Sequence, residues 1–126
     1  MSRKIYVTEP FLPPLGEYVK SLEKIWSSKQ LTNNGSFHQK FEKELADYLG
    51  VKHVSLFNNA TTALLVAIKG LELKGEIITT PYSFVATSHS IIWNGLTPVF
   101  VDTDFHAGNI DPLKVEKMLN KKTGGI

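Results

Sequence analysis

The 126-residue chain contains no cysteine, which excludes disulfide bonds, thiolate metal ligands and a cysteine nucleophile. Arginine is nearly absent, since Arg3 stands alone against thirteen lysines, and bidentate guanidinium recognition of anions is therefore scarce. The 14 basic and 12 acidic side chains leave a net charge of +2, too even to indicate a nucleic-acid-binding surface. No apolar run approaches the roughly 18 residues of a membrane span, and the first residues lack a signal-peptide core. These absences favour a soluble cytoplasmic protein with neither nucleic-acid nor membrane partners.

Glycine-rich phosphate loops are also absent. The chain has no G-x-G-x-x-G motif. Gly70 and Gly75 have the spacing of a P-loop, but Glu76 stands where the P-loop has lysine, and the glycines follow a helical pattern instead of preceding one. This excludes a P-loop and argues against a nucleotide-binding α/β module of another enzyme class.

The first third of the chain predicts an extended arm and then two helices. Residues 8–14 hold three of the six prolines, which fix the backbone in an extended form. Apolar residues at helical spacing follow from Leu15, and residues 29–35 have the composition of a loop. Ser36, with Gln39 three positions later, has the pattern of a capping box and predicts a helix over residues 36–49 that Gly50 ends. We group residues 1–35 as an amino-terminal arm, helix and loop.

The remaining residues, 36–126, predict part of an α/β domain. Short apolar runs without alternation predict strands buried on both faces, whereas the segments between them have helical spacing. Strict alternation of the two predicts one parallel sheet flanked by helices. The strands are expected near residues 54–57, 76–80 and 98–102, and the helices near 61–73, 83–94 and 111–121. Asp111 should cap the last helix, with Val115, Met118 and Leu119 facing inward.

Ligands of open α/β sheets bind beyond the carboxyl ends of the strands, where three loops of this chain meet. The loop over residues 58–62 leads into a helix whose free N–H groups favour a phosphate. Its alternative role is plain helix capping by Asn59 or Thr61. In the loop over residues 81–84, Tyr82 and Phe84 suit stacking on a flat heterocycle, and the alternative is core packing.

The third loop, over residues 103–109, follows a strand that ends at Asp102. Asp102 and Asp104 suit metal ligation or general-base chemistry, and the alternative is that they form turns or caps. The four histidines are far apart in sequence and show no metal-ligand spacing.

Taken together, these segments resemble the DegT/DnrJ/EryC1/StrS family of pyridoxal-phosphate-dependent sugar aminotransferases over about residues 8–123. The order and spacing of the motifs carry the resemblance. They are Leu31-Thr32-Asn33-Asn34-Gly35 followed by Phe41-Glu42, Asn59-Ala60-Thr61-Thr62-Ala63-Leu64, Thr80-Pro81-Tyr82-Ser83-Phe84-Val85-Ala86-Thr87, Gly95 with Pro98-Val99-Phe100-Val101-Asp102, and Asn109-Ile110-Asp111. At Gly124-Gly125-Ile126 the chain departs from the family, which usually has a Lys-Ala-Ile type strand there.

The resemblance implies the amino-terminal part of the large domain of a fold-type I aminotransferase, a homodimer with pyridoxal 5′-phosphate (PLP) as its cofactor. By position, Ala60, Thr61 and Thr62 would hold the cofactor phosphate, and Phe84 would stack on the pyridine ring. The residues implied to lie near the sugar nucleotide are Phe11, Thr32, Asn33, Asn34 and Gly35.

The motifs are most similar to those of enzymes that aminate dTDP-4-keto-6-deoxyglucose, which implies glutamate as the amino donor and a product used in O-antigen or similar glycan synthesis. The resemblance also implies that the lysine that forms the Schiff base lies past residue 126, since none of the thirteen lysines sits in a matching motif. We therefore expect a truncated chain that has no catalytic residue of its own and is inactive alone. The alternative functions are a non-catalytic dimerisation partner and a nucleotide-binding α/β module.

Overall fold

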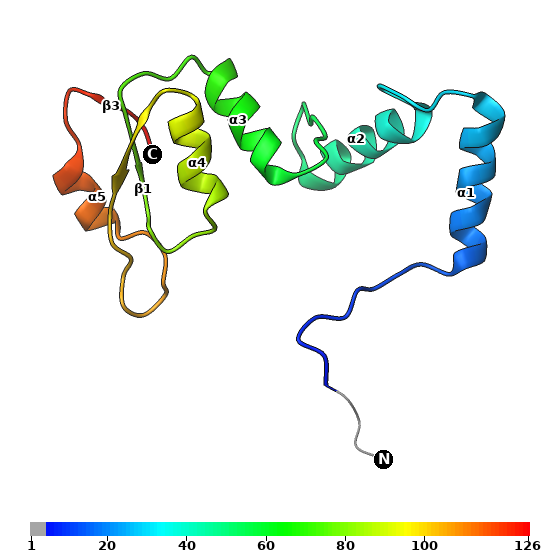
Figure 1. Ribbon diagram of the computed structural model, residues 1–126, viewed down its shortest axis with the longest axis horizontal. Coiled ribbons are helices and arrows are strands. Elements are labelled where there is room, and N and C mark those ends of the chain that lie inside the picture. Colours follow the sequence, from blue (N-terminus) through cyan, green and yellow to red (C-terminus); the bar gives the residue numbers. More distant parts are fainter. Residues whose placement is uncertain (1–4) are drawn as a thin grey trace. The chain divides into compact units, whose positions relative to one another are not determined.

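The computed structural model describes residues 5–126, so the first four residues of the predicted arm, Arg3 among them, lie outside it (Figure 1). The chain divides into two compact units, Met1–Val54 and Ser55–Ile126. The sequence predicts a different division, after residue 35, between an amino-terminal arm and a cofactor-binding domain. That division is defined by function, and it stays a prediction.

The first unit contains two helices of equal length, α1 (Leu15–Ser28) and α2 (Ser36–Leu49). α1 begins directly after Pro14, as the prolines predict, and ends where Lys29 turns into the left-handed region at φ 55°. α2 ends at Gly50, whose φ of 66° suits a residue without Cβ. The predicted bounds of α2 and the intervening loop are thus confirmed.

The predicted capping box at the start of α2 is wrong. The N-cap residue is Gly35, which offers no side chain, and Ser36 is already the first helical residue. The side-chain amide of Gln39 instead donates to the backbone carbonyl of Asn34 at 2.9 Å. Asn33 and Asn34 take positive φ values of 45° and 52°, which asparagine tolerates better than most residues. The helical residues of α2 therefore begin at Ser36, one residue earlier than the Ser-x-x-Gln pattern predicts.

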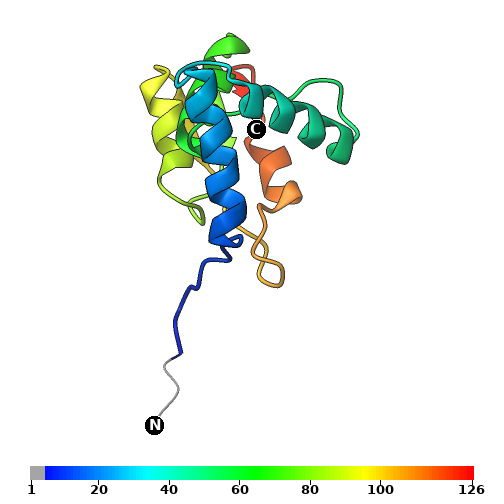
Figure 2. The same cartoon turned by 90° about the vertical axis from the view of Figure 1, so that its right-hand side faces the viewer.

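The second unit is a three-stranded parallel sheet with helices. Figures 1 and 2 show α4 and α5 on opposite sides of the sheet. The strand order is β2-β1-β3, and both pairings are parallel. The elements are α3 (Ala60–Gly70), β1 (Glu76–Thr79), α4 (Ala86–Trp93), β2 (Thr97–Phe100), α5 (Pro112–Met118) and β3 (Thr123–Gly125). This confirms the α/β class and the strands that the sequence predicts near residues 76–80 and 98–102.

The third strand differs from the prediction. Residues 54–57 form no strand, whereas Thr123–Gly125 does. A strand exists only where a neighbour pairs with it, and β1 already has β2 on one side and β3 on the other. The β3 segment pairs with β1 although two of its three residues are glycines. Its pairing is close, since a Cβ added to Gly124 would overlap the carbonyl oxygen of Lys74.

The core of this unit lies between β1 and α5. Ile78 is 1% exposed and packs with Val101 and Val115, and Val99 and Ile110 are partly buried against them. The inward position of Val115 is therefore confirmed. Met118 and Leu119, also predicted to face inward, are 43% and 50% exposed because α5 ends at Met118 and the chain turns away from the helix there.

The helix α4 is shorter than predicted. It begins at Ala86 instead of residue 83, because residues 81–83 form bends instead of a helical turn. Its side facing the unit is buried at Ala86, Ser90 and Ile91. The hydroxyl of Ser90 is satisfied inside the helix, donating to the carbonyl of Ala86 at 2.8 Å. α4 also contacts α3, where the Asn94 side chain donates to the carbonyl of Leu65 at 3.2 Å.

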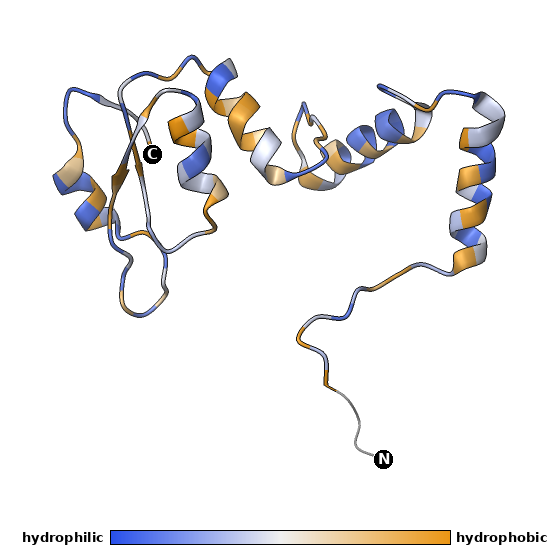
Figure 3. Ribbon diagram, in the orientation of Figure 1, coloured by the Kyte–Doolittle hydropathy of each residue, from blue (hydrophilic) through white to orange (hydrophobic). Residues whose placement is uncertain are grey.

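The helix α3 is apolar around most of its circumference, as the orange colour of its middle turns in Figure 3 shows. None of its residues is buried, and Val66 is 49% exposed. Because an apolar helix is stable in water mainly through packing, α3 has faces that the second unit by itself leaves uncovered.

Candidate functional site

The amino-terminal end of α3 follows an extended residue, Asn59, whose side chain caps the helix. Asn59 Oδ1 accepts hydrogen bonds from the Thr62 backbone N–H at 2.8 Å and from the Thr62 hydroxyl at 3.2 Å. The capping role considered for Asn59 is thus confirmed, and Thr61 is not the cap. This arrangement fixes the first turn in one conformation.

Capping leaves part of the helix terminus open. Asn59 occupies the Thr62 N–H, and the next amide, that of Ala63, donates to the Asn59 carbonyl at 3.2 Å. Within the described residues, the N–H groups of Ala60 and Thr61 and the Thr61 hydroxyl have no partner. Open amides at the positive end of a helix favour an anion, so the cap and a phosphate-binding role coexist here.

The β1–α4 loop, residues 80–85, lies at the carboxyl end of β1. Tyr82 and Phe84 are 76% and 77% exposed, so the reading of these rings as core residues is wrong. The Thr80 hydroxyl accepts from the Tyr82 N–H at 3.1 Å and tightens the turn. A cavity of about 290 Å³ runs along this loop and extends to β2. Its lining residues include Thr80, Phe84 and Phe100.

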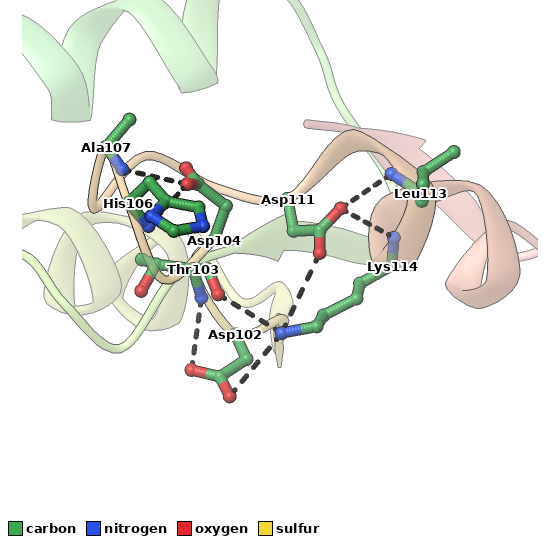
Figure 4. Close-up of polar contacts among 8 residues, drawn as sticks. All are labelled: Asp102, Thr103, Asp104, His106, Ala107, Asp111, Leu113 and Lys114. Carbon is green, nitrogen blue, oxygen red and sulfur yellow. Dashed lines mark hydrogen bonds and ion pairs between the residues drawn. The ribbon is translucent and has the colours of Figure 1, made fainter.

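The β2–α5 loop carries the acidic residues that follow β2, shown in Figure 4. The Asp104 carboxylate accepts from the N–H groups of Ala107 at 2.8 Å and His106 at 2.9 Å. These hydrogen bonds, first that of Ala107, hold the pKa of Asp104 below its ordinary value. Asp111 caps α5 as predicted, accepting from the Leu113 N–H at 2.9 Å.

These aspartates form turns and a helix cap in this structure, which confirms the structural role considered for them. Asp102 accepts from the N–H of Thr103 at 3.0 Å and pairs with Lys114 at 3.7 Å. Across residues 5–126, no three His, Asp or Glu side chains gather closely enough to hold a metal ion.

In the first unit, the loop between α1 and α2 borders a cavity with a volume of about 590 Å³. Four of the residues expected near the sugar nucleotide, Thr32, Asn33, Asn34 and Gly35, all line it, together with others that include Ile25 and His38. Phe11 is not among the lining residues and lies on the arm, 98% exposed. The structure thus brings together four of the five residues of this predicted group.

Comparison with known proteins shows to which family the chain is related. Residues 16–126 match the family model described as the DegT/DnrJ/EryC1/StrS aminotransferase family. The chain belongs to this family. It is 58% identical over 124 residues to the dTDP-4-amino-4,6-dideoxy-D-glucose transaminase of Escherichia coli, an alignment that covers 98% of this chain and 33% of the relative. The chain therefore spans about a third of the length of the curated relatives that it matches.

Solved structures agree with the family assignment. PseC of Helicobacter pylori, an aminotransferase involved in pseudaminic acid biosynthesis, superposes with a TM-score of 0.86 at 41% identity, covering 98% of this chain and 33% of PseC. NtdA of Bacillus subtilis, solved with its bound cofactor PMP, has a TM-score of 0.82 at 26% identity, covering 98% of this chain and 30% of NtdA. These likenesses confirm the predicted family and the fold-type of its large domain.

Sequence reasoning missed the part that Lys114 plays, because its ion pairs depend on a loop that folds back onto α5. It also missed the approach of the Tyr82 ring to Gly108, which brings two loops together that are 26 positions apart (108 minus 82). No sequence pattern around Lys114, Tyr82 or Gly108 indicates such contacts, because they depend on how distant loops fold. None of the helices within residues 5–126 combines the length and apolar composition that a membrane span needs.

Proposed function

We propose that this chain provides the phosphate-binding and ring-binding part of a PLP-dependent nucleotide-sugar aminotransferase. The reaction would move an amino group from glutamate to the keto carbon of a dTDP-4-keto-6-deoxyhexose. The observation that carries this proposal is the open amino-terminal turn of α3 at a family motif, in a chain 58% identical to a dTDP-4-amino-4,6-dideoxy-D-glucose transaminase.

The residues present fit the cofactor. Ala60 and Thr61 supply two open N–H groups, and Thr61 adds a hydroxyl, which together suit the oxygens of a phosphate. Thr62 is held by Asn59 and orders the turn, so its contribution to the phosphate is the least direct of the three. When bound, PLP supplies an electron sink for moving the amino group.

Phe84 supports the second half of the cofactor site. Its ring is 77% exposed on the β1–α4 loop, which leaves it free to cover a planar heterocycle. Both α3 and this loop belong to the second unit. We expect Phe84 to lie within about 12 Å of Ala60, a span that one cofactor in a pocket of ordinary volume bridges.

The cavity beside the α1–α2 loop supports a role in substrate binding. Its volume of about 590 Å³ lies in the usual range of small-molecule sites. Thr32, Asn33 and Asn34 offer hydroxyl and amide groups, which match the hydrogen-bonding needs of a sugar. Phe11, on the exposed arm, would help to shape the entrance.

The remaining parts of the proposal rest on the family alone. They are glutamate as amino donor, a homodimeric enzyme, a cytoplasmic location, no nucleic-acid or membrane partner, and a product used in O-antigen or similar glycan synthesis.

Replacing Asn59 separates helix capping from phosphate binding. Asn59→Asp keeps a good cap but adds a negative charge beside the open amides. Two like charges about 4 Å apart repel by roughly 1 kcal/mol in bulk water and roughly 4 kcal/mol near a protein surface, so we expect at least about a fivefold loss of affinity. The measurement is the dissociation constant of pyridoxamine 5′-phosphate (PMP), which has no aldehyde to react with lysines.

Asn59→Ser is the matched control, because serine caps as well and carries no charge. We expect it to bind PMP as the wild type does. Equal affinities for the Asp and Ser variants would show that the phosphate binds elsewhere and would refute the proposed cofactor site.

A further inference from the structure

The β2–α5 loop is held in one shape by hydrogen bonds between its own residues. Thr103 and Ile110 form an antiparallel bridge across its base. The Asp104 N–H donates to the Asn109 carbonyl at 2.9 Å, and the Asp104 carboxylate holds the tip through two further N–H groups. A loop with this many internal hydrogen bonds has few alternative conformations.

Lys114 fastens this loop to α5. Its ammonium group donates to the carbonyl of Thr103 at 3.1 Å and lies 3.7 Å from a carboxylate oxygen of both Asp102 and Asp111 (Figure 4). The three partners sit at the two ends of the loop. The neighbouring Val115 is buried in the core, so the lysine extends from a fixed part of the helix.

The tip of the loop touches the loop that carries Phe84. Gly108 has a φ of +68°, and a Cβ added there would lie 3.6 Å from Cε1 of Tyr82. The Tyr82 ring therefore borders the side of Gly108 on which a side chain would project, and any group larger than a methyl there would meet the ring. Tyr82 is otherwise 76% exposed, so this contact joins two loops at the sheet edge and is not part of the core.

We propose that the β2–α5 loop supports the β1–α4 loop, with Gly108 as the contact point and Lys114 as the clamp, and that both are positioning residues for Phe84. Phe84 follows Tyr82 by two positions, and Phe84 and Phe100 line the same cavity of about 290 Å³. A displaced Tyr82 would move the Phe84 ring and change the width of this cavity. The inference rests on the proposed function, in which Phe84 stacks on the cofactor ring.

The test compares the affinities of PMP and inorganic phosphate for the chain, measured from backbone amide shifts. Phosphate needs only the amino terminus of α3, whereas PMP also needs a correctly placed Phe84. The ratio of the two dissociation constants therefore reports on the loop and is insensitive to a general loss of folded protein.

Gly108→Asn introduces a side chain against Tyr82 in a residue type that tolerates positive φ. Its matched control is Gly95→Asn, because Gly95 has a φ of +75° and open space around it. Lys114→Met removes the clamp, with Lys117→Met on the same helix as control and Lys114→Arg as the conservative rescue. We expect the preference for PMP to fall about 2- to 12-fold in Gly108→Asn and Lys114→Met, the range of one aromatic contact, and to persist in the other three variants.

The outcomes distinguish failure of the proposed function from failure of the inference about the two loops. If wild-type chain binds PMP no better than phosphate, the proposed function fails, and the inference fails with it. If the wild type prefers PMP and both Gly108→Asn and Lys114→Met keep that preference, the inference alone is overturned. Should Gly108→Asn not fold, Lys114→Met with its arginine rescue decides the question.

Discussion

Replacing Gly124 by alanine is expected to detach β3 and to destabilise the second unit strongly. A Cβ at this position would overlap the carbonyl oxygen of Lys74, a backbone atom that no side-chain rotation can move. Overpacking of this kind typically costs about 1–3 kcal/mol, and the lost pairing with β1 adds to it. Urea unfolding should show the loss as a lower midpoint with an unchanged slope.

Gly75, directly before β1, tests the same approach of the β1 and β3 segments from the other side. The Cβ of Gly75→Ala would overlap the carbonyl oxygen of Lys122, and Gly75 has a φ of +81°, so we expect a similar loss. Gly70→Ala is the control, since Gly70 ends α3 with open space around it and alanine favours a helix. If Gly124→Ala and Gly70→Ala have equal stability, β3 does not pair as described.

Truncation of Ile78 is expected to have the other large effect. Its side chain is 1% exposed and packs with Val101 and Val115, so Ile78→Ala leaves a cavity between β1 and α5. Substitutions of this type cost about 2–5 kcal/mol, a large part of the stability of a small domain. Urea unfolding again measures the change in the free energy of unfolding.

Val66→Ala is the matched control for this truncation. Val66 is 49% exposed on α3, and exposed changes usually stay within about 0.5 kcal/mol. A loss at Val66 as large as that at Ile78 would mean that the core of the second unit lies around α3 instead of between β1 and α5.

The sequence predicts those parts of the fold whose signals are local. The end of α2 at Gly50 and the cap of α5 at Asp111 depend on a residue's own backbone or on a side chain next to it, and both predictions are confirmed. The strand predicted at residues 54–57 is wrong because an apolar run indicates burial, whereas a strand requires a partner. β3 is not predicted because its residues, Thr123–Gly125, have no apolar run, although backbone pairing does not require one.

The candidate site divides in the same way. Open amides at Ala60 and Thr61 follow from the start of a helical pattern after Asn59, and the loop from Thr32 to Gly35 lines one cavity as a group. Contacts between loops, such as Tyr82 on Gly108, depend on a positive φ and on the path of a distant segment. The placement of Phe84 relative to Ala60 stays a prediction.

A map of backbone amide shifts on titration with PMP would locate the cofactor on the chain. We expect the largest shifts at Ala60 and Thr61, from the phosphate, and a second group at Phe84, from the ring. α2 is an internal control, since its amino terminus lacks a side-chain cap and would attract an anion through the helix dipole alone. Equal shifts at Ser36 and Thr61, or the absence of any shift at Ala60 and Thr61, would contradict the claim that α3 begins at a cofactor-phosphate site.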